Sequence, residues 1–355
     1  MNKIRAAVLG AGYMGSAITF PLADNGIKIN LWGTWLDDAI IDSCRKGYHP
    51  KLKKKMPDNV TFFYSNDLAE AVKDVDMVFI AVTSNGFLDV FSKLIGVIDK
   101  NYIFFKLTKG LVDDKGVIKR MSQAAREIFE AKFPGEEFLW TVIGGPVKAG
   151  ELSNKIPTAS IYAPNNQKLI DLSLSFATDY YPITITNDSI GVEISSAFKN
   201  VYSVMIGICD GLYREFGEGN YHNLNAFLFN QGMLEISRMV EKAGGRASTA
   251  FDLAGIGDFY VASLSGRNRR YGEEVGKGGD PHKTFESMFE MGEVAEGYMA
   301  LKVSIDWVNS LDSKLIDDLP LLKTLYGIIF ENKEAKSSVL DFIKFMRQCW
   351  RKNFV

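Results

Sequence analysis

The chain has 355 residues, and its best candidate for acid–base chemistry is Lys199, in Glu193-Ile194-Ser195-Ser196-Ala197-Phe198-Lys199-Asn200. If 190–212 forms a helix at about 100° per residue, one stripe carries the polar positions Glu193, Ser196, Lys199, Asn200, Ser203 and Gly207. The other side is apolar, so we expect the helix to be largely buried. Because a buried ammonium without a partner is costly, Lys199 either snorkels to water or meets a polar group from another segment.

A second group of residues has the spacing that binds phosphates. Gly10-Ala11-Gly12-Tyr13-Met14-Gly15 lies between a predicted strand over Ile4–Leu9 and a predicted helix over Ser16–Asn25, the context in which G-x-G-x-x-G indicates dinucleotide binding. Gly10 allows the tight turn, Gly12 lets backbone approach a pyrophosphate, and Gly15 lets helix and strand pack closely. Amides at the helix N-terminus then bind the phosphates, so we predict NAD or NADP as cofactor. Tyr13 and Met14 either contact it or only pack.

The choice between NAD and NADP stays open in the sequence. The second predicted strand, Lys28–Trp32, ends in Gly33-Thr34 without an acid or an arginine at its tip, while Asp37 and Asp38 come slightly late for a ribose contact. We expect Thr34 to lie at the cofactor. For the lysine-rich segment His49–Lys55 we favour a solvated loop over a role near the adenosine phosphates.

The remaining patterns predict an α/β N-terminal domain of the Rossmann type, with a mainly parallel sheet, followed by an all-α C-terminal domain. Further short apolar strands are expected at Val60–Phe63, Met77–Val82, Tyr102–Lys106, Leu139–Ile143, Ala159–Tyr162 and Ile183–Thr186, with amphipathic segments at Asp67–Val72 and Val117–Lys132. Helices are expected at Ile190–Leu212, Asn223–Ala243, Thr284–Met291, Val294–Ser310 and Leu321–Arg351, with a loop-rich passage over 253–270. We therefore predict a dinucleotide-binding domain over 1–189 and a helical substrate-binding domain over 190–355.

Several polar or glycine residues follow predicted strand ends, where open α/β sheets bind their ligands. They are Thr83 in Thr83-Ser84-Asn85, Lys109 in Leu107-Thr108-Lys109-Gly110, and Gly145 in Gly144-Gly145-Pro146. This position predicts that Lys109 lies beside the nicotinamide.

Composition excludes several classes of function. With 41 basic and 43 acidic residues, the charge gives no argument for binding nucleic acid or an anionic membrane. We find no stretch apolar enough to cross a bilayer and no signal-peptide pattern at the N-terminus. The 3 cysteines and 3 histidines fit no disulfide framework and no metal-ligand spacing, so we expect no metal and a reducing cytoplasm.

Taken together and in order, the motifs resemble the NAD(P)-dependent glycerol-3-phosphate dehydrogenase family over nearly the whole chain. The matching segments are GAGYMG at 10–15, LTKGL at 107–111, GGPVKAGEL at 144–152, EISSAFKNVYSVMIGICDGL at 193–212, GIGDF at 255–259, SGRNRRYG at 265–272 and AEGYMALK at 295–302. Lys199-Asn200 followed by Asp258 and Arg267-Asn268 is the most specific part of the set.

The resemblance implies a role for each matching residue. Lys199 matches the catalytic base, Asp258 the aspartate beside it, and Lys109 the lysine near substrate and nicotinamide. Asn200, Arg267 and Asn268 match substrate contacts, Gly145 a substrate-binding backbone position, and Ala149 and Glu296 cofactor-side positions. Arg267 also falls among the expected cofactor contacts.

The residues themselves suit that chemistry. Oxidising a secondary alcohol needs a base for the hydroxyl proton, and a lysine serves when burial or a neighbouring cation lowers its pKa; Lys109 is the cation the sequence offers. The planar fork of Arg267 suits phosphate, and Gly266 before it lets backbone approach the ligand; the alternative is a solvated basic turn. Arg269 and Arg270 are expected to face solvent or the cofactor phosphates, and Gly276–Gly279 to let this loop close over the ligand.

We therefore expect an oxidoreductase that interconverts sn-glycerol 3-phosphate and dihydroxyacetone phosphate. Two departures from the family pattern, Ala262 in place of threonine and Val147 in place of a small residue, keep open another phosphorylated polyol or a hydroxy acid as substrate. A dinucleotide-binding sensor without turnover is a third hypothesis. The apolar helices and the tail over 342–350 fit either a homodimer interface or the cover of the helical domain's own core.

Overall fold

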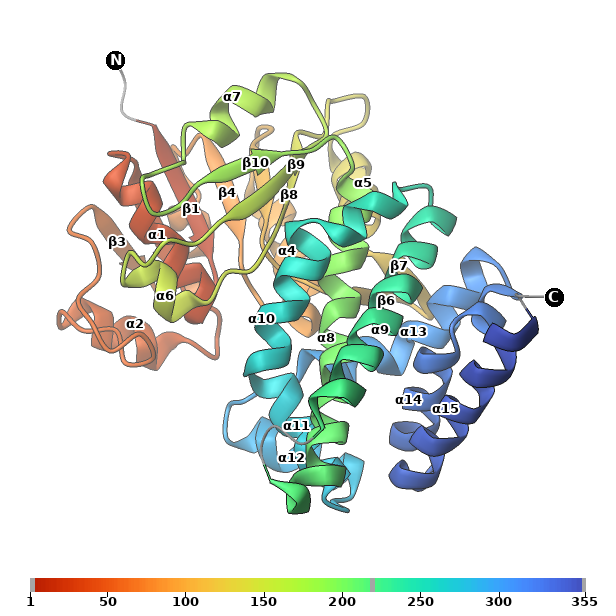
Figure 1. Ribbon diagram of the computed structural model, residues 1–355. Helices are drawn as coiled ribbons and strands as arrows, with labels where there is room; N and C mark the ends of the chain where they lie inside the picture. Colours follow the sequence, from red (N-terminus) through yellow and green to blue (C-terminus); the bar gives the residue numbers. More distant parts are fainter. Residues whose placement is uncertain (1–3, 218–220, 353–355) are drawn as a thin grey trace. The chain divides into compact units, whose positions relative to one another are not determined.

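The computed structural model describes residues 4–217 and 221–352. The chain folds into two compact units, one ending at Glu193 and the other beginning at Ile194, so the division falls inside a single long helix. In Figure 1 the first unit runs from red to yellow-green and the second from green to blue. The functional assignment of the ranges 1–189 and 190–355 stays a prediction.

The first unit is built on an 8-stranded sheet in the order β10-β9-β8-β5-β4-β1-β2-β3. The described pairs are parallel except for β8 with β9, which confirms the predicted mainly parallel sheet. The strands are β1 (Arg5–Leu9), β2 (Lys28–Trp32), β3 (Val60–Phe63), β4 (Met77–Ile80), β5 (Ile103–Lys106), β8 (Trp140–Gly144), β9 (Ser160–Pro164) and β10 (Ile183–Ile185).

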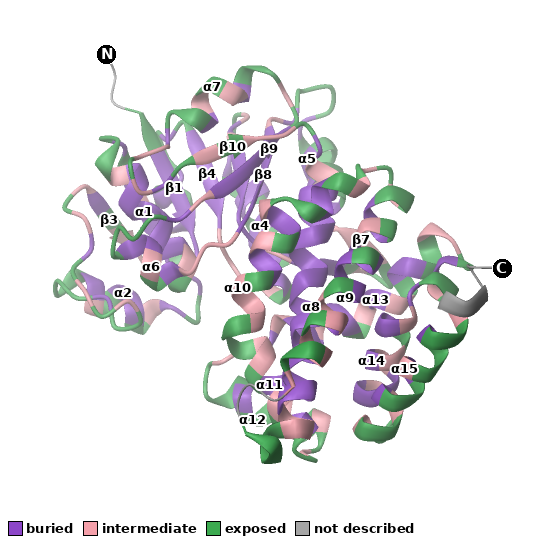
Figure 2. Ribbon diagram, viewed as in Figure 1, coloured by how far each residue is buried: buried purple, intermediate pink, exposed green. Residues whose placement is uncertain are grey.

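Helices cover both faces of this sheet, which is why its central strands β1, β4, β5 and β8 are buried over nearly their whole length. Phe104 and Phe105 are neighbours on β5 and therefore point to opposite faces. Phe105 stacks on Phe79, with ring centroids 4.6 Å apart, whereas Phe104 packs edge-on against Phe91. The helices are α1 (Tyr13–Asp24), α2 (Asp38–Arg45), α3 (Leu68–Ala71), α4 (Phe87–Val97), α5 (Met121–Lys132), α6 (Ala149–Ser153) and α7 (Lys168–Leu174). Figure 2 shows the central strands as buried, whereas the edge strand β10 is only partly buried.

The sequence analysis did not predict helices α2, α4, α6 and α7, and two predicted segments of the first unit also differ in the structure. The segment predicted as one amphipathic stretch, Val117–Lys132, begins with strand β7 (Val117–Arg120), which pairs antiparallel with β6 (Leu111–Asp114) before α5 starts. Lys115 and Gly116 both have positive φ, the geometry of a two-residue hairpin turn, and this turn chemistry overrides the helical pattern. Helix α1 also begins at Tyr13, inside the glycine motif, rather than at Ser16.

The second unit is all helical in the residues described, as predicted. Its elements are α8 (Ser189–Tyr213), α9 (His222–Lys242), α10 (Asp258–Leu264), α11 (Arg267–Gly276), α12 (Pro281–Glu290), α13 (Glu296–Leu311), α14 (Pro320–Phe330) and α15 (Ala335–Lys352). The prediction of a loop-rich passage over 253–270 is wrong: a π-helical turn, Leu253–Gly257, leads into α10, and α11 follows almost at once. The expected closing loop is therefore helix α11.

The tail also differs from one continuous helix. It breaks between α14 and α15, where Asn332 has a positive φ. Val339, Phe342 and Met346 on α15 are buried, and the Phe342 ring stacks on Phe227 of α9. This part of the tail covers the core of its own unit; the side chain of Trp350 lies outside the described residues. Among helices of the described ranges, none combines the length and apolar character needed to span a membrane.

Helices α8 and α11 approach each other through glycines on both sides. A Cβ placed on Gly207 of α8 would lie 2.0 Å from the Arg269 carbonyl oxygen, and one on Gly272 of α11 would lie 2.1 Å from the Val204 carbonyl oxygen. Gly211 and Gly276, one turn further along, repeat the contact at 2.2 Å each. Backbone therefore packs directly on backbone, and any side chain at these positions would separate the helices.

We predict that Gly207→Ala destabilises the protein by about 1–3 kcal/mol, because the added methyl forces α11 away from α8. The measurement is the urea midpoint of unfolding followed by circular dichroism. The matched control is Gly96→Ala on α4, where the new Cβ meets no described atom within 4 Å; better helix propensity should stabilise that variant by up to about 1 kcal/mol. Equal midpoints for the two variants would contradict the close packing.

Candidate active site

The glycine turn between β1 and α1 has the geometry that a pyrophosphate requires. Gly10 has φ +105°, and a Cβ there would lie 2.7 Å from the Ala81 carbonyl oxygen, while a Cβ on Gly15 would lie 1.9 Å from the Gly10 oxygen. At Gly12 a Cβ would meet no described atom within 4 Å, so the backbone is open on that side. Gly12 also precedes α1 without a side-chain cap, which leaves the first amides of the helix for a ligand.

Next to these glycines, Tyr13 is about half exposed whereas Met14 packs against the core. Tyr13 therefore remains a candidate for contact with the cofactor, and for Met14 the packing interpretation is the better one.

Thr34 and Asp37 tie the end of β2 to the glycine turn. Both are buried, and Asp37 Oδ2 accepts hydrogen bonds from the Thr34 hydroxyl at 2.8 Å, the Thr34 amide at 3.1 Å and the Ala11 amide at 3.4 Å. Asp37 lies five residues after the end of β2, but the chain folds back so that its carboxylate reaches the end of the strand. The arrangement fixes the turn without deciding between NAD and NADP.

The prediction of a solvated loop over His49–Lys55 is wrong for two of its residues. His49 is completely buried, and its Nε2 lies 2.8 Å from Ser16 Oγ of α1. Lys54 Nζ donates to the Asn154 side chain at 3.0 Å, at the end of α6. Lys51, Lys53 and Lys55 are exposed as expected.

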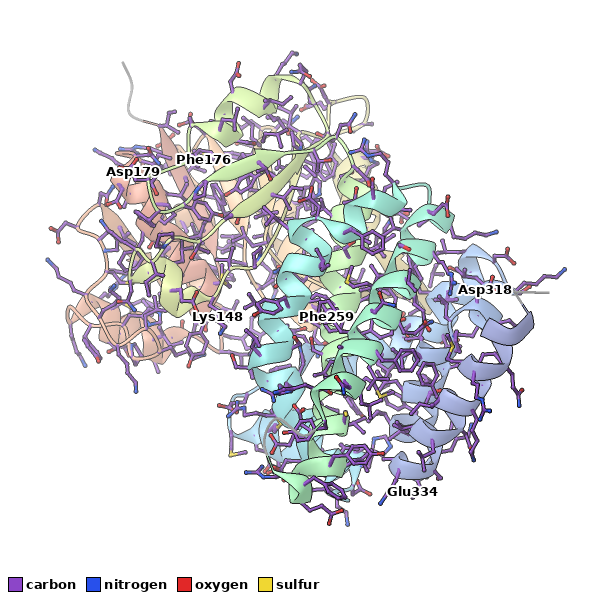
Figure 3. The ribbon with its side chains drawn as sticks, in the orientation of Figure 1. Lys148, Phe176, Asp179, Phe259, Asp318 and Glu334 are labelled. Carbon is purple, nitrogen blue, oxygen red and sulfur yellow. The ribbon has the colours of Figure 1, made fainter. Side chains whose placement is uncertain are left out.

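The loops after β4, β5 and β8 meet at the carboxyl edge of the sheet, as predicted from the strand ends. The Thr108 hydroxyl lies 2.9 Å from the Val82 carbonyl oxygen and so ties the β5 loop to the one carrying Thr83, which is exposed. Lys109 Nζ donates to the carbonyl oxygen of Gly145 at 3.3 Å. Gly145 itself has φ +117°. Ala149 is the first residue of α6, directly after Lys148, which Figure 3 labels. The structure thus brings Lys109 and Gly145 together.

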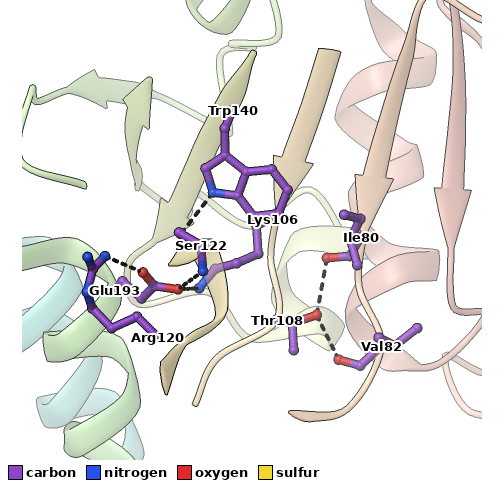
Figure 4. Close-up of polar contacts among 8 residues, drawn as sticks. All are labelled: Ile80, Val82, Lys106, Thr108, Arg120, Ser122, Trp140 and Glu193. Atoms are coloured by element: carbon purple, nitrogen blue, oxygen red, sulfur yellow. Dashed lines mark hydrogen bonds and ion pairs between the residues drawn. The ribbon is translucent and has the colours of Figure 1, made fainter. Parts of the chain in front are cut away.

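Lys106, three residues before Lys109, belongs to a buried ion network (Figure 4). Glu193 accepts hydrogen bonds from Lys106 Nζ at 2.8 Å, Arg120 Nη1 at 3.1 Å and the Ser122 amide at 3.0 Å. Burial pushes the pKa of Glu193 upward, but the two cations and the hydrogen bonds outweigh it and hold that pKa below its usual value. The network joins β5, the β6–β7 hairpin and the first turns of α8. Sequence analysis placed Glu193 on the polar stripe but did not identify its partners.

On the second unit, Lys199 has the polar partner that the stripe required. Its Nζ lies 2.8 Å from Asp258 Oδ1, and only 8% of Lys199 and 3% of Asp258 are exposed. Asp258 opens α10, and the next residue, Phe259, is fully buried against the ring of Phe229 at 4.3 Å between centroids (Figure 3). Packing of Phe259 therefore fixes the carboxylate beside the ammonium. The snorkelling interpretation of Lys199 is wrong.

A chain of amides continues from Lys199 toward α11 and α13. Asn268 donates through Nδ2 to Asn200 Oδ1 at 2.9 Å, and its own Oδ1 accepts from the Gly297 amide at 2.8 Å. This bond occupies one of the N-terminal amides of α13, the helix whose first residue is Glu296. Asn200, Asn268 and Gly297 are thus held in one cluster, although they are far apart in the sequence.

The three arginines of the motif at 265–272 have different surroundings. Arg269 pairs with the buried Asp210, so the expectation that it faces solvent or the cofactor phosphates is wrong. Arg270 pairs with Glu293 at the surface and is exposed to solvent, as expected. The side chain of Arg267 is exposed and makes no hydrogen bond or ion pair with another described residue. It begins α11 after Gly266, which has φ +134°, and the first turn of the helix contains no acidic residue. An unpaired cation at uncapped amides is suited to an anionic ligand.

These contacts define what each unit can do chemically. The first offers uncapped amides for phosphates and a lysine at the carboxyl edge of the sheet. The second offers an ammonium held by a carboxylate, two amides in fixed orientation, and an unpaired arginine. None of the described residues form a cluster of three or more His, Cys, Asp or Glu that could hold a metal ion.

Comparison with known proteins connects both units to one family. Residues 5–170 match the model described as NAD-dependent glycerol-3-phosphate dehydrogenase N-terminus, and residues 188–340 match the corresponding C-terminus. The chain is 30% identical over 342 residues to the NADP(+)-dependent glycerol-3-phosphate dehydrogenase of Archaeoglobus fulgidus, covering 96% of this chain and 99% of the relative. It is 32% identical over 348 residues to the NAD(P)+ enzyme of Clostridium perfringens, with 96% of each covered.

Solved structures agree with these sequence relatives. The crystal structure of glycerol-3-phosphate dehydrogenase from Coxiella burnetii superposes with a TM-score of 0.80 at 28% identity, covering 96% of this chain and 99% of that one. The resemblance seen in the motifs is confirmed: the chain belongs to the NAD-dependent glycerol-3-phosphate dehydrogenase family.

Proposed function

We propose that this protein interconverts sn-glycerol 3-phosphate and dihydroxyacetone phosphate with NAD(H) or NADP(H), using Lys199 as the general acid and base. The observation that carries the proposal is the buried Lys199–Asp258 ion pair next to the Asn200–Asn268 hydrogen bond, in a chain that belongs to this family. One unit binds the cofactor, and the other supplies the proton and the contacts to the substrate.

The cofactor would be held by the glycine turn. Amides at Gly12 and the start of α1 bind the pyrophosphate, with Gly10 and Gly15 shaping the turn and Tyr13 and Thr34 at its sides. Further contacts come from Thr83, Lys109, Ala149, Arg267 and Glu296. When bound, the nicotinamide ring supplies or takes up the hydride at the C2 carbon of the substrate.

Lys199 handles the proton. In the reducing direction its ammonium donates a proton to the C2 carbonyl oxygen as the hydride reaches C2, which yields the alcohol and a neutral lysine. In the oxidising direction the neutral amine takes the hydroxyl proton. Asp258 orients the ammonium and compensates its charge while it is buried. Lys109, whose Nζ donates to the Gly145 carbonyl oxygen, would polarise the substrate oxygen.

Arg267 and the amides after Gly266 bind the phosphate of the substrate. Arginine offers a planar pair of donors for phosphate oxygens, and the N-terminus of α11 adds backbone donors and a favourable dipole. Asn268 is fixed between Asn200 and Gly297, so the donors next to Arg267 keep their orientation before substrate arrives. The phosphate then provides binding energy at a distance from the reacting carbon.

A second candidate keeps the chemistry and changes the alcohol. Ala262 lies one helical turn after Asp258 on α10 and therefore on the same side of that helix. Because a threonine is usual there in the family, the missing hydroxyl favours a substrate with a different polar pattern near C2, another phosphorylated polyol or a hydroxy acid.

We also propose a cytoplasmic location, in line with the free thiols of Cys44, Cys209 and Cys349. A homodimer stays a prediction, which light scattering on the purified protein would test.

The test of the function is an activity matrix. Purified protein is mixed with NADH or NADPH and a panel of substrates: dihydroxyacetone phosphate, other phosphorylated ketoses and keto acids. Oxidation of either cofactor with dihydroxyacetone phosphate as the best substrate supports the proposal. A much higher kcat/KM on another compound favours the second candidate. Cofactor binding without turnover on any compound would leave a dinucleotide sensor.

Replacing the proposed acid and base should remove catalysis but keep the cofactor site. We predict that Lys199→Ala lowers kcat by about 10²- to 10⁴-fold, since proton transfer in the transition state is lost. The affinity for NADH, measured by fluorescence titration, should stay unchanged. Lys323→Ala, an exposed lysine of α14, is the control and should keep full activity. Undiminished turnover by Lys199→Ala would remove this residue from the mechanism.

The phosphate role of Arg267 can be separated from a general effect of charge. We predict that Arg267→Ala raises KM for dihydroxyacetone phosphate by about 10- to 100-fold, the loss of one charge-assisted contact, while the low activity on unphosphorylated dihydroxyacetone stays the same. Arg270→Ala, which breaks only the pair with Glu293, should leave KM nearly unchanged. If both variants raise KM equally, Arg267 has no specific role.

A further inference from the structure

His49 is the buried histidine of the first unit, and the proposed reaction assigns it no role. It follows α2 and faces the glycine turn from the side of the 49–54 loop. The loop closes on itself: the His49 amide donates to the Lys54 carbonyl at 2.8 Å, and the Lys53 amide, at a residue with φ +55°, donates to the His49 carbonyl at 2.8 Å. Lys54 then fastens the loop to α6. The backbone of His49 is therefore fixed independently of its ring.

The contacts of the ring identify its tautomer. The Leu52 amide donates to Nδ1 at 3.0 Å, so this nitrogen is an acceptor and the ring proton is on Nε2. Nε2 lies 2.8 Å from Ser16 Oγ and 3.2 Å from the Ala11 carbonyl oxygen. Burial is the largest cause that lowers the pKa of His49, with Lys51 acting in the same direction while Asp37 and the Ala11 hydrogen bond oppose it. A neutral ring with one donor nitrogen matches this set of partners.

The Ala11 carbonyl is thus held by two side chains. Besides the contact with His49, it accepts the Ser16 hydroxyl at 3.1 Å, while the Ala11 amide on the other side donates to Asp37. The carbonyl of Ala11 and the amide of Gly12 belong to one planar peptide group and point in opposite directions. Holding the carbonyl against His49 therefore directs the Gly12 N–H away from the ring.

We propose that His49 is a positioning residue for cofactor binding: through the Ala11–Gly12 peptide it fixes the Gly12 amide in the orientation that donates to the pyrophosphate. The inference rests on the proposed role of the glycine turn as the dinucleotide site. A free peptide at this position could rotate its carbonyl toward the phosphates, which would repel them; the His49 and Ser16 contacts remove that state before the cofactor arrives.

The experiment compares His49→Leu, His49→Gln and Ser16→Ala. We expect His49→Leu to raise the Kd for NADH, measured by fluorescence titration, and KM for NADH by about 3- to 10-fold, the loss of one oriented hydrogen bond. Turnover number and KM for the substrate should not change. His49→Gln, whose amide can donate near the position of Nε2, should restore most of the affinity. Ser16→Ala should weaken NADH binding. In the double variant with His49→Leu, the fold increase in Kd should be smaller than the product of the two single increases.

The control is His282→Leu, a histidine of the second unit whose Nδ1 lies 2.9 Å from the Tyr298 hydroxyl; it should leave Kd for NADH unchanged. A folded His49→Leu variant with the wild-type Kd would overturn this inference but not the proposed function. The same holds if His49→Leu lowers kcat and raises the KM for NADH and for the substrate to the same extent, since this would indicate a merely structural residue. Failure of the unmodified protein to bind NADH or NADPH would overturn the proposed function as well. Where His49→Leu does not fold, the affinities of His49→Gln and Ser16→Ala decide.

Discussion

The close contact between α8 and α11 is the constraint on which the helical unit depends. Glycines at 207 and 211 on one helix and at 272 and 276 on the other bring backbone against backbone. At this separation Asn268, in the first turn of α11, reaches Asn200 on α8, one residue after the proposed acid and base. A wider spacing would leave both amides without their partner and would displace Arg267 from Lys199. The small residues therefore set the distance between Lys199, the proposed acid and base, and Arg267, the proposed phosphate contact.

A common feature of both units is that polar groups are fixed before any ligand binds. Glu193 has three donors in a buried network, Asp258 is placed by the packing of Phe259, and the Ala11 peptide is held on both sides. Groups oriented in advance need no reorganisation when charge develops in the substrate, and this is where electrostatic catalysis gains most. Burial of Glu193, Asp258 and the polar atoms of Ala11 is tolerated because each of these groups has a partner of the opposite kind.

Sequence patterns predicted correctly those elements whose secondary structure is set by their own residues. β2 and β3 have the limits expected from their apolar runs, and the glycine motif lies in the predicted strand–turn–helix context. We predicted a loop-rich passage over 253–270 because glycines, which have a low helix propensity, recur there; tertiary packing, such as that of Phe259 on Phe229, makes most of it helical. His49 was missed because burial of one residue in a lysine-rich segment leaves no periodic signal. Its partner Ser16 could be found only once the fold placed the two segments together.

The arginines of α11 show how the structure distinguishes Arg267, the proposed phosphate contact, from its neighbours. A cation in the first turn of a helix is unfavourable, because the amides there carry partial positive charge; the cost is about 0.3–1 kcal/mol. Arg269 and Arg270 are relieved by Asp210 and Glu293, but Arg267 has no such acid among the described residues. An incoming phosphate would relieve Arg267 and the uncapped amides together. The sequence alone could not distinguish the three arginines, since the acids that pair with two of them lie on α8 and just before α13.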